Sequence, residues 1–200
     1  MTIGEYAQMI NGESWLKNGA KCELEVVKNL NYDHQTKYQL PVKPSPNLPN
    51  MLSVYLYPSL CFFEGTAISV GRGTEFPFQQ IGHPSLKGFP HLFIPRPMLG
   101  ASDPKLNGQK CFGYFFGKDT VENWLEKPEL ELDWLLEFYH TYDHKKEFFN
   151  NYFNTLAGNS SLKSDITAGK SAEEIRASWQ KDLTSFKVTR KKYLLYPDFE

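Results

Sequence analysis

Four prolines stand between Leu40 and Asn50, and this cluster constrains the fold more than any other feature of the sequence. Each proline fixes its own φ angle, lacks an N–H donor and disfavours a helical conformation in the residue before it. The segment therefore cannot form a regular helix or a central strand. We interpret it as a stiff, extended connector between a first segment, residues 1–40, and a second segment, residues 41–200.

The first segment contains the patterns of one helix and one strand. Thr2 and Glu5 have the spacing of a capping box, which predicts a helix over residues 3–10. Apolar and charged residues then alternate over residues 21–26, which is the period of a strand with one buried face. Because the helix pattern begins so early, we expect no signal peptide in this chain.

The second segment begins with a nearly continuous apolar run, Met51 to Phe63, that contains Pro58. Periodicity does not decide between a kinked buried helix and a buried strand, and we favour the helix. A glycine-rich stretch follows over residues 65–82. Short strand-like pieces are expected around residues 92–94 and 111–116.

The last third of the chain has helical patterns. Pro128 opens a segment whose apolar residues recur every four positions as far as Tyr142. Ser171 and Glu174 form a second capping box, which predicts a long helix. The expected buried face of that helix consists of Ile175, Trp179, Leu183 and Phe186.

The chain ends in the segment 193–196, which we expect to be a strand or a tail docked on the core. We interpret the cluster Arg190-Lys191-Lys192, just past the predicted helix, as a solvated helix end. Together the patterns predict an α+β fold, with a small mixed sheet and helices concentrated toward the C-terminus.

Charge and composition exclude several classes of function. The net charge is −1 and no long basic block occurs, so nucleic acid is a poor partner. No apolar run reaches the length of a transmembrane helix, so no membrane span is expected. Cys22, Cys61 and Cys111 lack metal or redox spacing. Three buried thiols is the simplest interpretation, with one disulfide left open.

Candidate chemistry gathers at the glycine-rich stretch. Arg72 stands between Gly71 and Gly73, where its planar guanidinium would suit a carboxylate or phosphate. The structural alternative is a glycine turn whose arginine pairs with a neighbouring acid. His140 and His144 have the spacing of a helical metal pair, but no third ligand accompanies them, so we predict no metal site.

Around this stretch the sequence resembles the NamZ family of exo-β-N-acetylmuramidases. The similarity is strongest in Tyr57–Thr66 (YPSLCFFEGT), in Ser69–Thr74 (SVGRGT) and in Pro77-Phe78. The segments 44–49 (PSPNLP) and 1–5 (MTIGE) also resemble the family. So does the tail, in Leu156-Ala157-Gly158, Ile175-Arg176, Trp179 and Arg190–Tyr196.

The resemblance implies release of N-acetylmuramic acid from the non-reducing ends of peptidoglycan fragments, without a metal or organic cofactor. It implies a two-part protein, in which a Rossmann-like N-terminal half and a smaller C-terminal half meet at the substrate cleft. This sequence corresponds to the C-terminal half, and residues 1–40 are expected to pack with the N-terminal domain. Its location would be extracytoplasmic, either periplasmic or secreted. The alternative is a non-catalytic carbohydrate-binding or interaction domain without its catalytic partner, so enzymatic activity of this chain alone stays open.

Glycoside hydrolysis commonly uses two carboxylates. Glu64 is the candidate for one of them, because its glycine and apolar neighbours would shield it from water. Glu75 and Asp103 lie in turns, so the second carboxylate is expected in the N-terminal half. Arg72 would bind the lactyl carboxylate that distinguishes muramic acid from glucosamine. The other residues assigned to substrate binding are Thr66, Ser69, Gly71, Gly73, Thr74 and Phe78.

Overall fold

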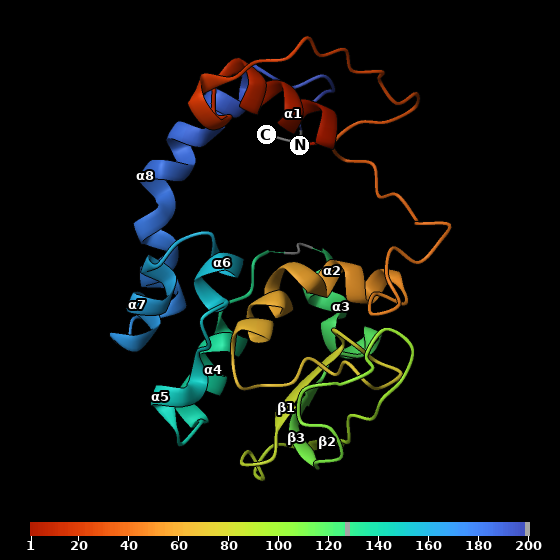
Figure 1. The fold of residues 1–200 in the computed structure, drawn as a ribbon, viewed down its shortest axis with the longest axis vertical. Coiled ribbons are helices and arrows are strands. Elements are labelled where there is room, and N and C mark those ends of the chain that lie inside the picture. The colour runs from red at the N-terminus through yellow and green to blue at the C-terminus, as the bar shows by residue number, and fades with distance from the viewer. Residues whose placement is uncertain (127–128, 199–200) are drawn as a thin grey trace. The chain divides into compact units, whose positions relative to one another are not determined.

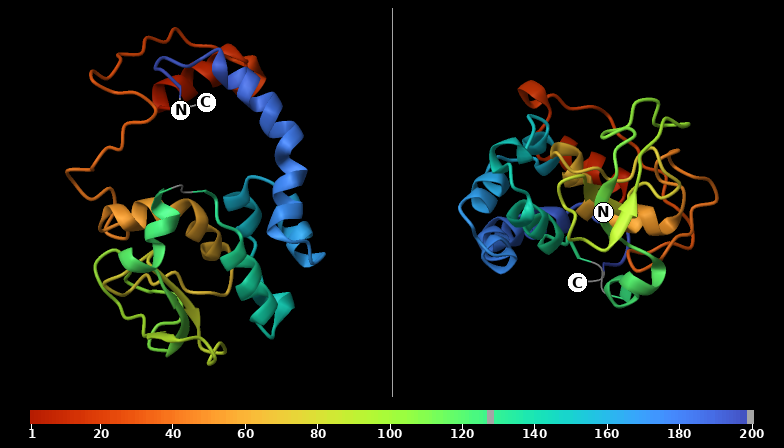
Figure 2. Two further views of the ribbon diagram at one scale, coloured as in Figure 1. Left: turned by 180° about the vertical axis from the view of Figure 1, so that it is seen from behind. Right: turned by 90° about the horizontal axis from the view of Figure 1, so that it is seen from below.

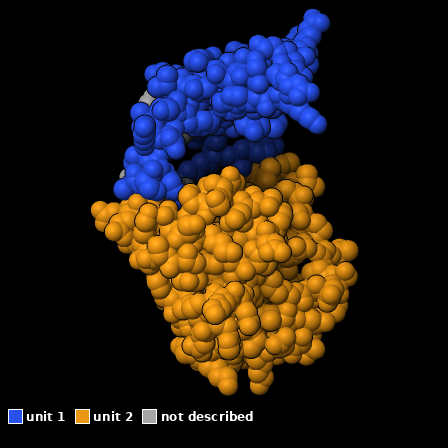
Figure 3. All heavy atoms as spheres, turned by 60° about the vertical axis from the view of Figure 1, so that its left-hand side comes forward, with its two compact units in different colours: residues 1–38, 176–200 blue, residues 39–175 orange. Residues whose placement is uncertain are grey.

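The computed structural model describes residues 1–126 and 129–198, and these form two compact units (Figure 3). Unit 1 consists of Met1–Tyr38 together with Arg176–Glu200, and unit 2 consists of Gln39–Ile175. The predicted α+β class is confirmed, since helices are combined with a small sheet. Within the described part of the chain, no helix is long and apolar enough to cross a membrane.

Unit 1 is built around helix α1, Ile3–Gly12, and the later part of helix α8, Ala172–Lys191 (Figure 1). The predicted capping box of α1 is present in both directions, because Thr2 and Glu5 each accept the other's backbone N–H. A short 3₁₀ helix, η1, follows at Lys17–Gly19.

The strand predicted over residues 21–26 is wrong. The segment is not helical, but it pairs with no other strand among the described residues, and a strand needs a ladder of hydrogen bonds to a neighbour. The side-chain amide of Asn11 binds both the N–H and the C=O of Cys22 instead. Cys22 and Leu24 are exposed, so the expected buried face does not form. The buried-thiol interpretation therefore fails at Cys22, and Cys61 is only half-buried.

A buried charge network joins the two ends of unit 1. Glu5 is fully buried, and both of its carboxylate oxygens lie within 3.0 Å of His34 Nε2. The other ring nitrogen of His34 lies 3.2 Å from Asp198, and Arg190 donates two hydrogen bonds to the same Asp198 carboxylate. The interpretation of Arg190 as part of a solvated helix end is therefore wrong, because this cation is 7% exposed and ion-paired.

The tail 193–196 is not a strand but docks on α1, which was the alternative that the sequence left open. Its Leu195 N–H donates to Glu5 at 2.8 Å, and the Tyr193 hydroxyl donates to Glu13 at 2.8 Å. Burial tends to raise the pKa of Glu5. Hydrogen bonds from the backbone of Leu195 and Thr2 and from His34 outweigh this effect, so the pKa of Glu5 is lowered.

Unit 2 begins with the proline segment, which contains no helix and no ladder, as predicted. Helix α2, Met51–Leu60, and the 3₁₀ helix η2, Cys61–Gly65, then confirm the helical interpretation of the apolar run. Asn50 caps α2 by accepting the Ser53 N–H at 3.0 Å.

The sheet of unit 2 has three strands in the order β1-β3-β2. Their bounds are Gln80–His83 for β1, His91–Phe93 for β2 and Cys111–Phe115 for β3. Both pairings are antiparallel, so the prediction of a mixed sheet is wrong. Strands β2 and β3 confirm the two strand-like pieces. β1 lies at the end of the glycine-rich stretch, where the sequence predicted no strand.

Of the remaining helices of unit 2, α4 to α7 gather on one side of the sheet and its loops, and α3 lies apart from them (Figures 1 and 2). They are α3 Lys118–Glu126, α4 Asp133–Thr141, α5 Lys145–Phe148, α6 Phe153–Ala157 and α7 Ser161–Thr167. The predicted stripe is present on α4, where Phe138 is fully buried, and Tyr142, directly after the helix, is also buried. The proposed start at Pro128 lies outside the described residues.

The buried face predicted for α8 is only partly correct. Ile175 is fully buried, but Leu183 and Phe186 are each 40% exposed. The reason is that α8 leaves unit 2 after Ile175 and continues into unit 1. A stripe of helical period therefore does not pack against one continuous core along the whole helix.

We predict that Glu5→Gln lowers the free energy of unfolding at neutral pH by roughly 1–3 kcal/mol, because it removes the charge from a fully hydrogen-bonded buried group. A lowered pKa stabilises the fold above the unfolded value of 4.5 and ceases to do so as the pH falls through the folded value. The difference from wild type should therefore shrink below about pH 4.5. Urea unfolding across this pH range measures it, with the exposed Glu23→Gln as the control. A difference independent of pH would contradict the assignment to charge.

Candidate functional site

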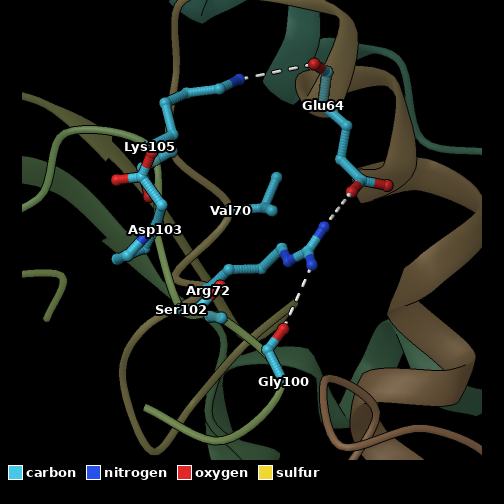
Figure 4. Close-up of a pocket in the computed structure, with 10 residues that line it drawn as sticks. Glu64, Val70, Arg72, Gly100, Ser102, Asp103 and Lys105 are labelled. Atoms are coloured by element: carbon cyan, nitrogen blue, oxygen red, sulfur yellow. Dashed lines mark hydrogen bonds and ion pairs between the residues drawn. The ribbon is translucent and has the colours of Figure 1, made fainter. Parts of the chain in front are cut away.

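A cavity of about 400 Å³ opens in unit 2 beside the glycine-rich loop (Figure 4). Three segments form its wall: the end of η2, the loop itself and a second loop at residues 100–105. The lining residues are Glu64, Ser69, Val70, Arg72, Gly100, Ala101, Ser102, Asp103, Pro104 and Lys105. Of the predicted site residues, Glu64, Ser69 and Arg72 are thus brought together.

Glu64 is held at the cavity by the packing of its neighbours. Phe63 is fully buried and Phe62 is 6% exposed, so η2 has little freedom to turn. Gly65 lies against the backbone of Phe153, where an added Cβ would stand 2.5 Å from that residue's Cα. The Asn150 amide also donates to the Glu64 carbonyl oxygen at 3.1 Å. The carboxylate itself remains 22% exposed and reaches the cavity.

Arg72 pairs with Glu64 across the cavity, as Figure 4 shows. Its Nη1 donates to Glu64 Oε1 at 3.3 Å, and its Nη2 donates to the Gly100 carbonyl at 3.2 Å. This is the structural arrangement that the sequence offered as an alternative, a glycine turn whose arginine meets a nearby acid. The Arg72 side chain nevertheless stays 43% exposed, so part of its donor surface is open to a ligand.

The glycines beside Arg72 are required by the backbone. Gly71 has φ +75° and Gly73 has φ +83°, a conformation that other residues rarely adopt. A Cβ at Gly73 would lie 2.7 Å from both the Arg96 carbonyl oxygen and Pro104. The loop therefore packs directly on the segment that leads into the second cavity loop.

The three hydroxyl residues of the loop bind the loop's own backbone. Thr66 donates to the Phe63 carbonyl at 2.8 Å and accepts the Ile68 N–H. The hydroxyl of Ser69 accepts the Gly71 N–H at 3.2 Å. Thr74 donates to the Gly71 carbonyl at 2.7 Å. These bonds shape the loop, and substrate contact by these hydroxyls stays a prediction.

The aromatic residues of the loop differ in their exposure. Phe78 is 3% exposed, has φ +55° and packs against Tyr57 with ring centroids 5.0 Å apart. Phe76 is 43% exposed and packs edge-on against Phe115. Like Thr66, Thr74 and the two glycines, Phe78 is not among the residues that line the cavity. Its predicted role as a sugar wall stays a prediction.

Sequence reasoning missed the second cavity loop and its lysine. Lys105 is exposed over the residue as a whole, but its ammonium group is largely buried, with Nζ within hydrogen-bond distance of four backbone carbonyls. The distances are 3.2 Å to Phe63, 3.4 Å to Glu64, 2.6 Å to Thr66 and 3.0 Å to Ile68. No local motif signals this contact, because about forty residues separate donor and acceptors in the sequence. Asp103, assigned from the sequence to a turn, also lines the cavity.

Burial determines the titration of several groups around the cavity. It lowers the pKa of Lys105 to about 8, although the Glu64 carboxylate acts in the opposite direction. Burial raises the pKa of the Cys61 thiol to about 11, and it also raises the pKa of Tyr57. Cys111, in β3, is buried with a pKa of about 12, and all three cysteines are free thiols.

Among the described residues, no group of three or more histidine, cysteine, aspartate or glutamate side chains is placed to hold a metal ion. His140 and His144 instead make edge-on ring contacts with Tyr139 and Tyr142, respectively.

Comparisons with known proteins agree with the features described above. The C-terminal model of the exo-beta-N-acetylmuramidase NamZ matches residues 55–196, and the N-terminal model of the same family matches residues 1–52. The peptidoglycan beta-N-acetylmuramidase NamZ of Bacillus subtilis strain 168 is 34% identical over 215 residues. That alignment covers 98% of this chain and 50% of the relative.

Two solved structures are also similar, both of DUF1343 family proteins from Bacteroides fragilis NCTC 9343. One has a TM-score of 0.92 at 45% identity and covers 99% of this chain and 56% of that protein. The other has a TM-score of 0.63 at 20% identity, with 97% and 56% covered, and supports the fold alone. The chain therefore spans about half the length of the relatives that it matches.

The fold and the cavity define an α+β domain with a carboxylate, an arginine and a lysine gathered at a glycine loop. The family models and the relative from B. subtilis identify the family: the chain belongs to the NamZ family.

We predict that Gly73→Ala lowers the free energy of unfolding by roughly 1–3 kcal/mol, because the positive φ and the close Arg96 carbonyl both oppose a side chain. The control is Gly88→Ala, since a Cβ at Gly88 meets nothing within 4 Å. Thermal unfolding of both variants measures the difference. Equal stability of the two would show that the loop tolerates a change of backbone conformation.

Proposed function

We propose that this chain is the cleft-forming C-terminal part of an exo-β-N-acetylmuramidase, which releases N-acetylmuramic acid from the non-reducing ends of peptidoglycan fragments. The observation that carries the proposal is the agreement between the family assignment and the cavity, where Glu64 and Arg72 meet. The named relative acts on peptidoglycan as a beta-N-acetylmuramidase. Because this chain spans half of that relative, its own activity is inferred for a protein that also carries the other half.

In the proposed reaction Glu64 supplies one of the two carboxylates. Its ion pair with Arg72 uses the carboxylate form, which is the form that acts either as a base on the attacking water or as a nucleophile at the anomeric carbon. The second carboxyl group protonates the leaving oxygen. We assign that group to the Rossmann-like N-terminal half, with Asp103 as the alternative within this chain because it lines the same cavity.

Arg72 would distinguish muramic acid from glucosamine. Muramic acid carries a lactyl carboxylate, and a guanidinium fork binds a carboxylate through two parallel hydrogen bonds. In the structure one Nη atom of Arg72 serves Glu64 and the other serves Gly100. A substrate carboxylate would share or replace these acceptors, and the partial exposure of the side chain leaves room for that exchange.

The location follows from the substrate. Peptidoglycan lies outside the cytoplasm, so we place the protein in the periplasm or the exterior, with a role in cell-wall turnover.

The competing function is a carbohydrate-binding module, which requires binding of muramyl sugars but no turnover.

The first test is hydrolysis of para-nitrophenyl β-N-acetylmuramic acid. We expect turnover by a version that carries the N-terminal half found in the relatives, and little or none by the 200 residues alone. In the active version, Glu64→Gln should lower kcat by about 10²–10⁴-fold, because it removes the ionisable group but keeps the side-chain size. Asp103→Asn tests the alternative carboxylate.

The exposed Glu75→Gln is the matched control, since Glu75 does not line the cavity. Full activity of Glu64→Gln would remove Glu64 from the reaction. Binding of muramyl sugars without turnover in either version would favour the module.

A second prediction concerns specificity. Arg72→Ala should weaken binding of N-acetylmuramic acid by roughly 10- to 100-fold, because a charge-assisted pair is lost. Binding of N-acetylglucosamine, which lacks the lactyl carboxylate, should change little. Arg72→Lys keeps the charge without the planar fork and should be intermediate. Titration calorimetry with both sugars measures this, and equal weakening of the two ligands would show that Arg72 does not read the lactyl group.

A further inference from the structure

Lys105 reaches from the second cavity loop to the backbone around Glu64 (Figure 4). Its ammonium group has three N–H donors, and four carbonyl oxygens lie within 3.4 Å of Nζ. These carbonyls belong to the last residues of η2 and to the turn that follows it. One side chain thus gathers the backbone on both sides of the Glu64–Gly65 turn.

The position suits a cation. The last carbonyls of a helix have no partner within the helix and carry partial negative charge. An ammonium ion is a compact point donor, whereas a guanidinium is planar and cannot direct its N–H groups to one converging set of oxygens. Lysine is therefore the side chain whose geometry matches these four acceptors.

We propose that Lys105 is a positioning residue of this site. Its ammonium group draws the carbonyls of residues 63, 64, 66 and 68 together and so fixes the direction in which the Glu64 carboxylate enters the cavity. The kinetic consequence rests on the proposed function, but the contact itself is a property of this chain.

The pKa of the Lys105 ammonium group differs from those of its thiol and phenol neighbours. Glu64, Arg72 and His83 are the titratable groups that act on Lys105 or respond to its charge. Burial lowers the pKa of Lys105 to about 8, whereas the pKa of Cys61 is raised to about 11 and that of Tyr57 is also raised. A loss of activity as the pH rises through 8 therefore separates Lys105 from its thiol and phenol neighbours.

Stability should move in the opposite direction over the same range. Between about pH 8 and the ordinary lysine value of 10.5, the unfolded chain holds the Lys105 proton and the folded chain releases it. The unfolded state then binds more protons, so this residue makes the fold more stable as the pH rises. A purely structural lysine would lose activity together with stability, whereas a positioning residue loses activity while stability is kept.

The test has two arms, and the first uses this chain without substrate. Backbone amide signals of Thr66, Ala67 and Ile68 are followed by NMR between pH 6 and 10 in the wild type and in Lys105→Met, which replaces the ammonium with a neutral side chain of similar length. We expect a common titration near pH 8 in the wild type that is lost in the variant. Lys110→Met, at an exposed position nearby, is the control and should keep it.

The second arm uses the version with the N-terminal half and the muramyl substrate. Lys105→Met should lower kcat by roughly 10- to 100-fold with KM little changed and thermal stability retained, and the decline above pH 8 should disappear. Lys105→Arg should not rescue kcat, because charge alone is insufficient.

The proposal is overturned if the amide signals of the wild type and of Lys105→Met respond to pH in the same way. It is also overturned if Lys105→Met keeps its kcat, or loses activity only in proportion to stability. Failure of the wild type to hydrolyse the substrate counts against the proposed function instead, and the NMR arm then decides the positioning role by itself.

Discussion

The burial of η2 against the aromatic core is the interaction on which the site depends. Phe63 is fully buried, and its ring lies 5.6 Å from that of Phe138 on α4. Phe62 packs toward Phe153 on α6, with ring centroids 6.2 Å apart. Glu64 is the next residue in the chain, so aromatic packing anchors the backbone that carries the cavity carboxylate.

Aromatic burial contributes more free energy to holding Glu64 in place than its ion pair with Arg72 does. Complete burial of a phenylalanine side chain contributes roughly 1.5–3 kcal/mol. An ion pair whose cation is as exposed as Arg72 contributes about 0–1 kcal/mol. The pair between Glu64 and Arg72 therefore does not hold the loop together. It can break when a ligand enters without a large loss of stability, which is what the proposed exchange of Glu64 for a substrate carboxylate would require.

The sequence was sufficient where the signal is local. Capping residues predicted the start of α1, and the apolar run around Pro58 predicted α2. Glycines mark the loop that carries Ser69 and Arg72 to the cavity, and Glu64 stands just before this loop on η2. Predictions failed where an element depends on a partner that is distant in the sequence. The alternating pattern over residues 21–26 is real, but a strand also needs a neighbouring strand, and no described segment supplies one.

Lys105 illustrates the same limit at the site itself. Nothing in the sequence around Lys105 indicates that it would bind the carbonyls around Glu64, because that contact needs the two cavity loops to lie together, as they do where Gly73 lies against Pro104. The missing side chain at Gly73 is thus one condition for the approach of the second loop, and the approach in turn brings the ammonium to η2. Gly73, predicted from the sequence to bind substrate, thus acts in the structure on the backbone, because its lack of a side chain allows the second cavity loop to approach.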